Sequence, residues 1–270
     1  MERPAWAPRS IDISVPSVSR IYDYYLGGSH NFEVDREAAR KAMEFLPGVP
    51  KIMQANRAFM RRAVRYAAGQ GITQFLDIGS GIPTFGNVHE VAQSLVPGAR
   101  VVYVDHDPVA VAHSQAVLDG NADAEVVAAD LLGPQEILAS DAVRRLIDLN
   151  RPVALLLVAI LHFVEDVEEA RAAVRELRDA CAPGSLLVLT HASFEGVAVA
   201  PERAEGFVDV YKDIRNPLIM RSREEIARFF EGYEMVEPGL VPMPDWRPDT
   251  PPEDEDPYAF SGFAGVGRTA

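Results

Sequence analysis

The stretch FLDIGSGIP, residues 75–83, joins a short run of large apolar residues to a turn that contains two glycines. The apolar run is typical of a buried β-strand, apart from the carboxylate at Asp77. Gly79 and Gly81 let the backbone turn sharply and approach a ligand closely, although a ligand-free strand-to-helix turn would need the same glycines. Because ligands bind beyond the carboxyl ends of strands in an open parallel sheet, the stretch predicts a binding site at one sheet edge.

Short apolar runs alternate with helical patterns from residue 72 onward. This alternation predicts parallel strands joined by helices that cover both faces of one sheet. The runs are almost continuously apolar, as expected for strands buried on both sides. They are ITQFLDI (72–78), ARVVYVD (99–105), AEVVAAD (124–130), PVALLLVAI (152–160) and GSLLVLTHA (184–192).

The two ends of the chain differ from this central pattern. Residues 1–16 are proline-rich and predict a loose arm, and residues 17–70 read as an all-helical cap in front of an α/β domain at 71–270. Near the C-terminus, residues 233–241 and 258–267 predict an antiparallel pair, with an irregular acidic loop between them. We therefore expect a mostly parallel seven-stranded sheet with an antiparallel edge.

The composition argues against several classes of protein. The 270 residues carry a net charge of −14, whereas binding to a nucleic-acid backbone or an anionic membrane needs a basic surface. The longest apolar run, 153–161, is too short to span a bilayer. Cys181 is the only cysteine, which excludes an intramolecular disulfide and fits a cytoplasmic protein. No histidine and carboxylate cluster has metal-ligand spacing, so we expect no metal site.

Carboxylates stand at the ends of three successive predicted strands. Asp105 ends the second strand, where it can accept hydrogen bonds from both hydroxyls of a ribose. Asp130 ends the third and can reach an adenine amino group, and Asp77 can meet an ammonium group directly or through water. Asp107 is better placed to cap the helix that begins at Pro108. Each acid alone could be a cap or a turn residue, but together they form a pattern suited to a nucleoside.

Three of these motifs resemble those of a known enzyme class. FLDIGSG (75–81), VVYVDHDP (101–108) and VVAAD (126–130) are similar, in order and spacing, to the first three motifs of class I S-adenosylmethionine-dependent methyltransferases. The whole chain resembles a bacterial family of S-adenosyl methyltransferases. The resemblance implies a Rossmann-like fold and methyl transfer from S-adenosylmethionine to a small molecule, with S-adenosylhomocysteine as product.

The resemblance also implies roles for particular residues. The glycine turn would line the methionine part of the cofactor, and the strand-end acids would hold its nucleoside. In chain order these residues are Gly79, Ser80 and Gly81 for the methionine part, Asp105 for the ribose, and His106 and Asp130 for the adenine. We also expect the backbone at Ala159, after the fourth strand, to accept a hydrogen bond from the methionine ammonium.

The turn departs from the common pattern of the class. Many members have a third glycine where this chain has Pro83, and the turn GIPTFGN (81–87) is lengthened. The branch that methylates protein carboxyl groups has a similar turn and pairs an upstream arginine with the cofactor carboxylate, a role that Arg57 can fill here. The rival dehydrogenase fingerprint, G-x-G-x-x-G, fails because its third glycine is Thr84.

Catalytic groups are less well marked than binding groups, because methyl transfer depends mostly on placement. His162, after the fourth strand, is a candidate general base, and His191 is a second candidate. Small accessory helices often cover the cofactor in the class that this chain resembles, so the N-terminal segment rich in tyrosine and glycine suggests that Tyr22, His30 and Asn31 close over the site and contact cofactor or acceptor. A helix that is simply packed by its tyrosines and stopped by its glycines is an equal alternative for this segment, and packing or capping is the plainer interpretation for His162 and His191. A protein that binds the cofactor without catalysis remains an alternative.

Overall fold

The computed structural model describes residues 11–212, 214, 217–249 and 262–270. Its sheet has the strand order β3-β2-β1-β4-β5-β8-β6, and a short β7 pairs with β8. Strands β1 to β5 run parallel to one another, whereas β8 is antiparallel to both β5 and β6. In spatial order the strands are β3 (Ala124–Ala128), β2 (Arg100–Asp105), β1 (Gln74–Ile78), β4 (Ala154–Val158), β5 (Leu186–His191), β8 (Phe263–Thr269) and β6 (Tyr233–Met235), with β7 at Val241–Pro242. The predicted parallel sheet with an antiparallel edge is confirmed, and β7 is an addition to it.

The helices fall into an N-terminal group and a set that connects the strands. The first group is α1 (Val18–Tyr25), α2 (Glu33–Phe45) and α3 (Val49–Gly69). The connecting helices are α4 (Val88–Leu95), α5 (Pro108–Val117), α6 (Pro134–Ala139), α7 (Asp141–Leu146), α8 (Val167–Ala180), α9 (Pro201–Lys212) and α10 (Arg223–Ala227). The described residues also form three short 3-10 turns, η1 (Leu161–Phe163), η2 (Arg228–Phe230) and η3 (Met243–Asp245).

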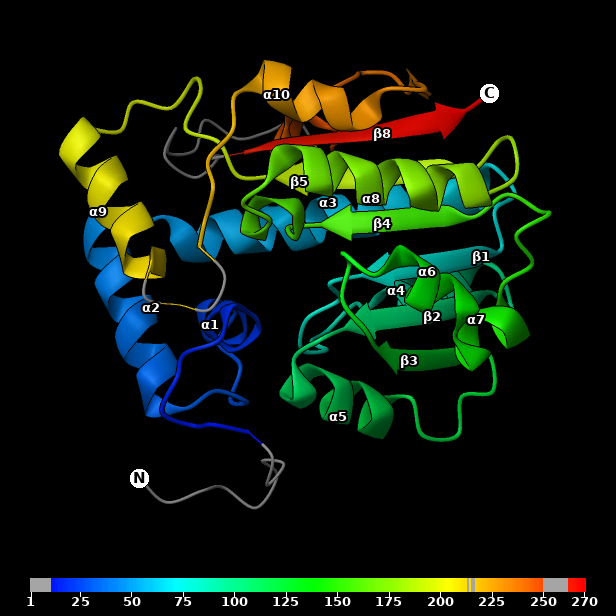
Figure 1. The fold of residues 1–270 in the computed structure, drawn as a ribbon, viewed down its shortest axis with the longest axis horizontal. Helices are drawn as coiled ribbons and strands as arrows, with labels where there is room; N and C mark the ends of the chain where they lie inside the picture. Colours follow the sequence, from blue (N-terminus) through cyan, green and yellow to red (C-terminus); the bar gives the residue numbers. More distant parts are fainter. Residues whose placement is uncertain (1–10, 213, 215–216, 250–261) are drawn as a thin grey trace.

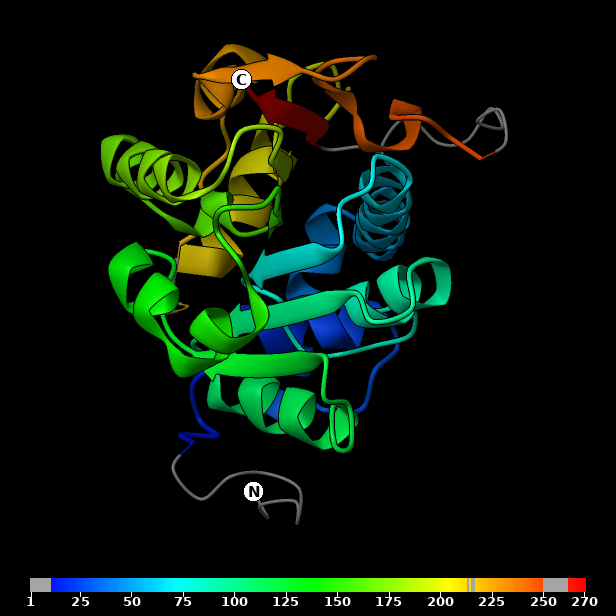
Figure 2. The same ribbon diagram turned by 90° about the vertical axis from the view of Figure 1, so that its right-hand side faces the viewer.

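Helices cover both faces of the sheet, as Figure 2 shows with α8 on one side and α3 on the other. Side chains alternate along each strand, so Leu76 and Ile78 of β1 face the core under α6, α7 and α8. Phe75 belongs to the opposite core under α3 and α4. Because Asp77 follows Phe75 by two positions, its side chain points to the α3 side. The alternation therefore places this carboxylate beside the helix that carries Arg57.

The carboxyl ends of the parallel strands face a group of helices that come from distant parts of the chain. In Figure 1 the arrowheads of β2, β3 and β4 point toward α1, α2 and α9. Ile21 and Tyr25 of α1 lie in the α3-side core together with Phe207 of α9. Helices α2 and α9 approach so closely that a Cβ on Gly206 would lie 2.2 Å from the Phe45 ring. The N-terminal helices and α9 thus cover this edge of the sheet together.

The acidic, proline-rich segment at 242–257 is more regular at its start than we predicted. It begins with the end of β7 and the 3-10 turn η3, whereas residues 250–257 lie outside the described residues. Trp246 is fully buried and contacts the rings of Phe59 and Tyr66 edge-on. Arg62 of α3 donates hydrogen bonds to two carbonyl oxygens of this segment. The prediction of an irregular loop was wrong here, because one large apolar side chain anchors the segment against α3.

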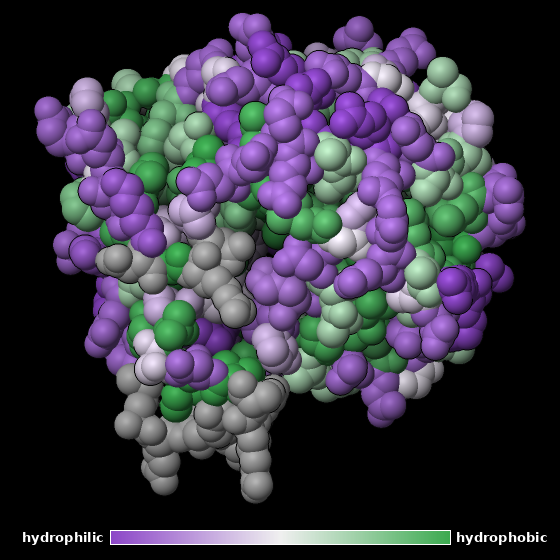
Figure 3. All heavy atoms as spheres, viewed as in Figure 1, coloured by the Kyte–Doolittle hydropathy of each residue, from purple (hydrophilic) through white to green (hydrophobic). Residues whose placement is uncertain are grey.

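The face of the molecule drawn in Figure 3 is mainly polar. On the face drawn in Figure 3, hydrophilic residues cover most of the molecule and hydrophobic ones show in patches between them. Within the part of the chain that the structure describes, no helix is both long and apolar enough to cross a membrane.

Candidate active site

Two hollows lie at the carboxyl ends of the strands, underneath α1. The polar hollow, of about 640 Å³ including its opening to solvent, is bordered by the ends of β1, β2 and β4. The apolar hollow, of about 680 Å³ on the same measure, lies between α1, α3, α9 and η1. The two adjoin each other, because both are lined by Val18, Tyr22, Asn56, Ala159 and Phe163.

The turn after β1 forms the floor of the polar hollow. Gly79 and Gly81 have φ angles of 74° and 67°, in the left-handed region that favours glycine. A Cβ on Gly79 would lie 2.6 Å from the Ile160 side chain. The amide groups of Gly79 and Ser80 both donate to the carbonyl oxygen of Val104. Both the backbone conformation and the close approach therefore require glycine at position 79.

Asp105 is held rigidly at the end of β2. One of its carboxylate oxygens accepts from the Gly81 amide at 2.7 Å and the other from the Asp107 amide at 2.8 Å. Burial raises the pKa of Asp105, and these two hydrogen bonds oppose the rise. Each oxygen keeps a second lone pair. The group is therefore orientated to accept two further hydrogen bonds, as from the hydroxyls of a ribose.

Asp77 and Arg57 face the polar hollow with opposite charges and form no ion pair with each other. Among the described residues no hydrogen bond or ion pair reaches the buried Asp77 carboxylate, and burial raises its pKa to about 7 despite the attraction of Arg57. Arg57 donates from Nη2 to Asn87 at 3.1 Å, but its buried Nε has no partner in the described structure. The buried Ser80 hydroxyl likewise lacks a partner there. These unpaired groups suit a zwitterion, with its ammonium on Asp77 and its carboxylate on Arg57.

The polar hollow continues toward the end of β3. This side hollow, of about 510 Å³ including its opening, is lined by Asp105, His106, Asp130 and Ile160. The exposed Asp130 uses one oxygen to accept from the Leu132 amide at 2.9 Å. Asp130 therefore keeps its other oxygen for a donor, such as the amino group of an adenine.

A chain of hydrogen bonds runs along the junction of the two hollows. The Ala159 amide donates to Thr190 Oγ1 at 2.8 Å, Thr190 donates to Asn56 at 2.7 Å, and Asn56 donates to the Tyr22 hydroxyl at 2.8 Å. Ala159 has φ 60°, a conformation that costs a residue with a Cβ about 1–3 kcal/mol. Strain of this kind is concentrated at functional sites. The chain links the end of β4 to the helix that covers both hollows.

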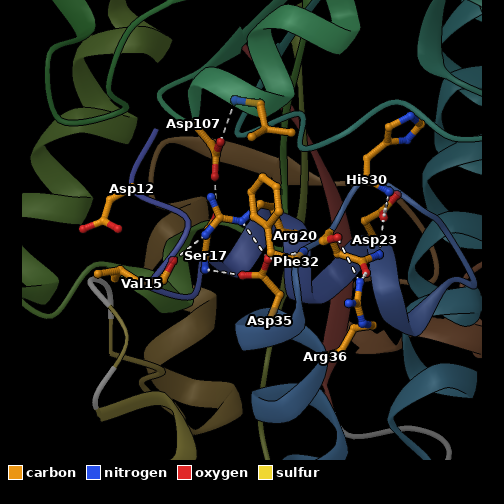
Figure 4. A network of polar contacts seen from close by, with 12 residues as sticks. Asp12, Val15, Ser17, Arg20, Asp23, His30, Phe32, Asp35, Arg36 and Asp107 are labelled. Atoms are coloured by element: carbon orange, nitrogen blue, oxygen red, sulfur yellow. Dashed lines mark hydrogen bonds and ion pairs between the residues drawn. The ribbon is translucent and has the colours of Figure 1, made fainter. Parts of the chain in front are cut away.

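The helix α1 is fixed to the rest of the protein by a polar network, shown in Figure 4. Arg20 forms an ion pair with Asp35 at 2.9 Å, and both side chains are buried. Asp35 also accepts from the Ser17 amide at 2.9 Å. The Ser17 hydroxyl donates to Asp107, whose other oxygen caps α5 through the Val109 amide. The Asp107 amide in turn donates to the Asp105 carboxylate, so the network extends to Asp105.

The two histidines near the apolar hollow are neutral and have fixed tautomers. His162 Nδ1 accepts from the Ala192 amide at 3.2 Å, so the ring proton lies on Nε2. His191 donates from Nδ1 to the Ala192 carbonyl oxygen at 2.8 Å and accepts at Nε2 from Arg221. Burial is the main cause that lowers the pKa of His162 well below its usual value and that of His191 to about 4. Both rings therefore stay uncharged at neutral pH.

The chain matches the family model of the S-adenosyl methyltransferases over residues 4–270. It belongs to this family. The cofactor is thus S-adenosylmethionine, and the zwitterion and nucleoside sites match the two ends of that molecule. Because the chain belongs to this family, it is a methyltransferase and not a dehydrogenase.

Two crystal structures are similar to this methyltransferase over nearly its full length. A protein from Thermobifida fusca YX, described as a candidate methyltransferase, has 41% sequence identity and a TM-score of 0.91, and the match covers 98% of this chain and 99% of that one. A DUF574 family protein from Streptomyces avermitilis MA-4680 has 39% identity and a TM-score of 0.90, over 96% and 99% of the two chains. No curated protein matches this chain.

The structure brings the predicted cofactor residues together. Those that line the polar hollow or its side hollow are Arg57, Asp77, Gly79, Ser80, Gly81, Asp105, His106, Asp130 and Ala159. Tyr22 and His162 line the apolar hollow. His30 lies elsewhere, packed against His113 with ring centroids 3.7 Å apart, and Asn31 binds Asp23 within the cap.

Sequence reasoning missed the residues that shape the junction and its support. Asn56, Thr190 and Arg221 were not identified, although Asn56 directly precedes Arg57. Arg221 is buried and donates to carbonyl oxygens of Leu161 and Val164, so it holds the segment that carries His162. Helix α9 was missed as well, although its buried Phe207, Val210 and Tyr211 have helical spacing.

Proposed function

We propose that this methyltransferase binds S-adenosylmethionine in the polar hollow and methylates a small molecule held in the apolar hollow. The observation that carries the proposal is that Asp77 and Arg57, two side chains of opposite charge, face one hollow without forming an ion pair with each other. A buried carboxylate without a partner is costly, and a ligand ammonium would compensate that cost. When bound, S-adenosylmethionine supplies a methyl group on a positively charged sulfur.

The protein's own groups then have separate tasks. Asp77 holds the ammonium and Arg57 the carboxylate of the amino-acid end, while Asp105 orientates the ribose. Helix α1 excludes water from above, since Val18 and Tyr22 line both hollows. Placement of this kind supplies much of the rate enhancement of a displacement reaction.

A small acceptor is supported by the enclosure and the charge of the site. The apolar hollow lies among buried side chains of α1, α3 and α9, and its lining is mostly apolar with a few polar groups, as in many ligand pockets. The net charge of −14 supports neither a nucleic acid nor an anionic membrane as partner. A cytoplasmic location, and the division of the chain near residue 70 into helical cap and catalytic domain, also stay predictions.

Calorimetry with two ligands tests the assignment. S-adenosylhomocysteine contains the amino-acid end, whereas 5′-methylthioadenosine lacks it. Hydrogen bonds to charged groups contribute about 1.5–3 kcal/mol, so Asp77→Asn and Arg57→Met should each weaken S-adenosylhomocysteine binding by about tenfold to a hundredfold. Neither substitution should change the affinity for 5′-methylthioadenosine. Equal losses for both ligands would contradict the assignment.

Turnover separates an enzyme from a protein that only binds the cofactor. The protein is incubated with methyl-labelled S-adenosylmethionine and an extract of small metabolites. A labelled product that requires Asp105 supports catalysis. Tight cofactor binding without any labelled product would support the non-catalytic alternative instead.

A further inference from the structure

The apolar hollow carries no formal charge. Among the described residues that line it, none is Asp, Glu, Lys or Arg. Its titratable side chains are Tyr22, Tyr25, His162, His191 and Tyr211. Burial raises the pKa of all three tyrosines, that of Tyr211 to about 12, and keeps both histidines neutral. A charged acceptor would therefore lose its hydration without gaining a partner of opposite charge.

The hydrogen bonds within the lining leave no group free to take a proton. The Tyr22 hydroxyl donates to the Met53 carbonyl oxygen and accepts from Asn56. Both nitrogens of His191 are engaged, and Nδ1 of His162 is occupied by the Ala192 amide. A neutral imidazole that carries its proton on Nε2 and accepts at Nδ1 cannot act as a base toward the hollow. This arrangement argues against the general-base role expected for His162.

At least two donors remain for a bound molecule. His162 lines the hollow, and its Nε2–H has no hydrogen-bond partner among the described residues. The hydroxyls of Tyr25 and Tyr211 lie 3.0 Å apart, so one donates to the other and the second proton is available. The lining therefore offers hydrogen-bond donors between apolar walls that include Phe163 and Phe207.

The nature of the nucleophile follows from these groups. An alcohol must lose a proton when it is methylated, and no lining group accepts one. A neutral nitrogen attacks through its lone pair without losing a proton first. We propose, resting on the proposed function above, that the acceptor is an uncharged apolar amine or nitrogen heterocycle that also accepts a hydrogen bond from His162 Nε2–H.

The step balances without a protein base. The acceptor nitrogen forms the new bond to the methyl carbon with its lone pair, and the electron pair of the broken carbon–sulfur bond stays on sulfur. The positive charge moves from sulfur to nitrogen, so the total charge of the site is unchanged. Where the nitrogen carries a hydrogen, the proton leaves to water after the product is released.

The tautomer of His162 can be measured without any substrate. In protein labelled with ¹⁵N-histidine, the nitrogen NMR spectrum should show His162 as neutral with its proton on Nε2 from about pH 5.5 to 8.5. His162→Asn identifies the signals. Titration of His162 within this range, or a proton on Nδ1, would overturn the inference.

Transfer assays test the acceptor class directly. Methyl-labelled S-adenosylmethionine is offered with a panel of weakly basic, uncharged ring-nitrogen compounds that carry a second hydrogen-bond acceptor, such as methoxyquinolines, each matched in size with a phenol and a carboxylic acid. We expect label on the nitrogen compounds alone. Label on the phenols or acids, or no label on any nitrogen compound while S-adenosylhomocysteine still binds, would overturn the inference and leave the proposed function standing. Absence of S-adenosylhomocysteine binding would instead refute the proposed function.

Variants of His162 separate a hydrogen-bond donor from a base. His162→Asn retains an atom near Nδ1 for the Ala192 amide but does not reach the hollow, whereas His162→Gln reaches the position of Nε2. With the best nitrogen acceptor, His162→Asn should raise KM about tenfold with little change in kcat, and His162→Gln should restore KM. A loss of kcat above a hundredfold in both variants, with a changed pH profile, would indicate a base and contradict the inference.

Discussion

Replacing Asp77 by asparagine should stabilise the cofactor-free protein at neutral and alkaline pH. The carboxylate is buried, has no hydrogen-bond partner among the described residues and has a pKa of about 7. In the unfolded chain its pKa is near 3.8, the ordinary value for an aspartate. Folding therefore costs free energy whenever the carboxylate is ionised, and asparagine has nearly the same shape without the charge.

The sign and size follow from proton linkage. Between about pH 4 and 7 the folded state keeps the Asp77 proton that the unfolded state has lost, so this group lowers the free energy of unfolding as pH rises. Each pKa unit corresponds to about 1.4 kcal/mol, and the shift from 3.8 to about 7 amounts to a loss of up to about 4 kcal/mol. The loss is complete above about pH 7 and absent below about pH 4.

Urea unfolding of the parent and of Asp77→Asn, at a series of pH values without cofactor, measures the effect. Groups common to both proteins cancel in the difference. We expect nearly equal stabilities at pH 4 and a more stable variant at pH 8. Asp119→Asn, at an exposed position, is the matched control and should give a small difference that does not change with pH. If Asp77→Asn is no more stable than its parent at pH 8, the buried, unpaired carboxylate is not as described.

Three further outcomes are expected from the cofactor site. Binding of S-adenosylhomocysteine should release close to one proton at pH 6 and almost none at about pH 8.5, because Asp77 must be ionised to bind the ammonium. Calorimetry in buffers of different ionisation enthalpy measures the number of protons released. Asp77→Asn should abolish this release. Asp105→Asn should weaken both S-adenosylhomocysteine and 5′-methylthioadenosine by about tenfold to a hundredfold; a loss confined to one ligand would contradict a ribose contact. Gly79→Ala should lower the free energy of unfolding by about 1–3 kcal/mol more than Gly120→Ala does. Both glycines have a positive φ, but only a Cβ at position 79 would collide with another side chain, that of Ile160. Equal losses of stability in urea unfolding would refute the crowding.

The parallel sheet and the clustering of the candidate cofactor residues could be predicted because they depend on local sequence. Each strand is a short apolar run, and its last residues fall at the same edge as those of its neighbours. Gly79, Asp105 and Asp130 therefore meet without any detailed knowledge of packing. Arg57 was identified only by resemblance, and the structure places it on the same side of the sheet as Asp77 because α3 packs there.

The apolar hollow could not be predicted in the same way. Its walls come from α1, α3, η1, β5 and α9, which are far apart in the chain. The residues concerned, such as Ile52 and Phe207, look like ordinary core residues in the sequence. The tautomer of His162 depends on the backbone amide of Ala192, thirty residues away in the chain. The position of His162 in the sequence therefore could not indicate which ring nitrogen carries the proton.

One helix relates the two proposed substrate sites to each other. Val18 and Tyr22 of α1 line both hollows, so the distance between methyl donor and acceptor depends on where α1 lies. That position is fixed twice, by the buried pair of Arg20 with Asp35 and by the bond from Ser17 to Asp107. Because the Asp107 amide also donates to Asp105, Asp107 supports both the carboxylate proposed to bind the ribose and the helix above it. Alignment of donor and acceptor is thus a property of the folded scaffold, as a reaction catalysed by placement requires.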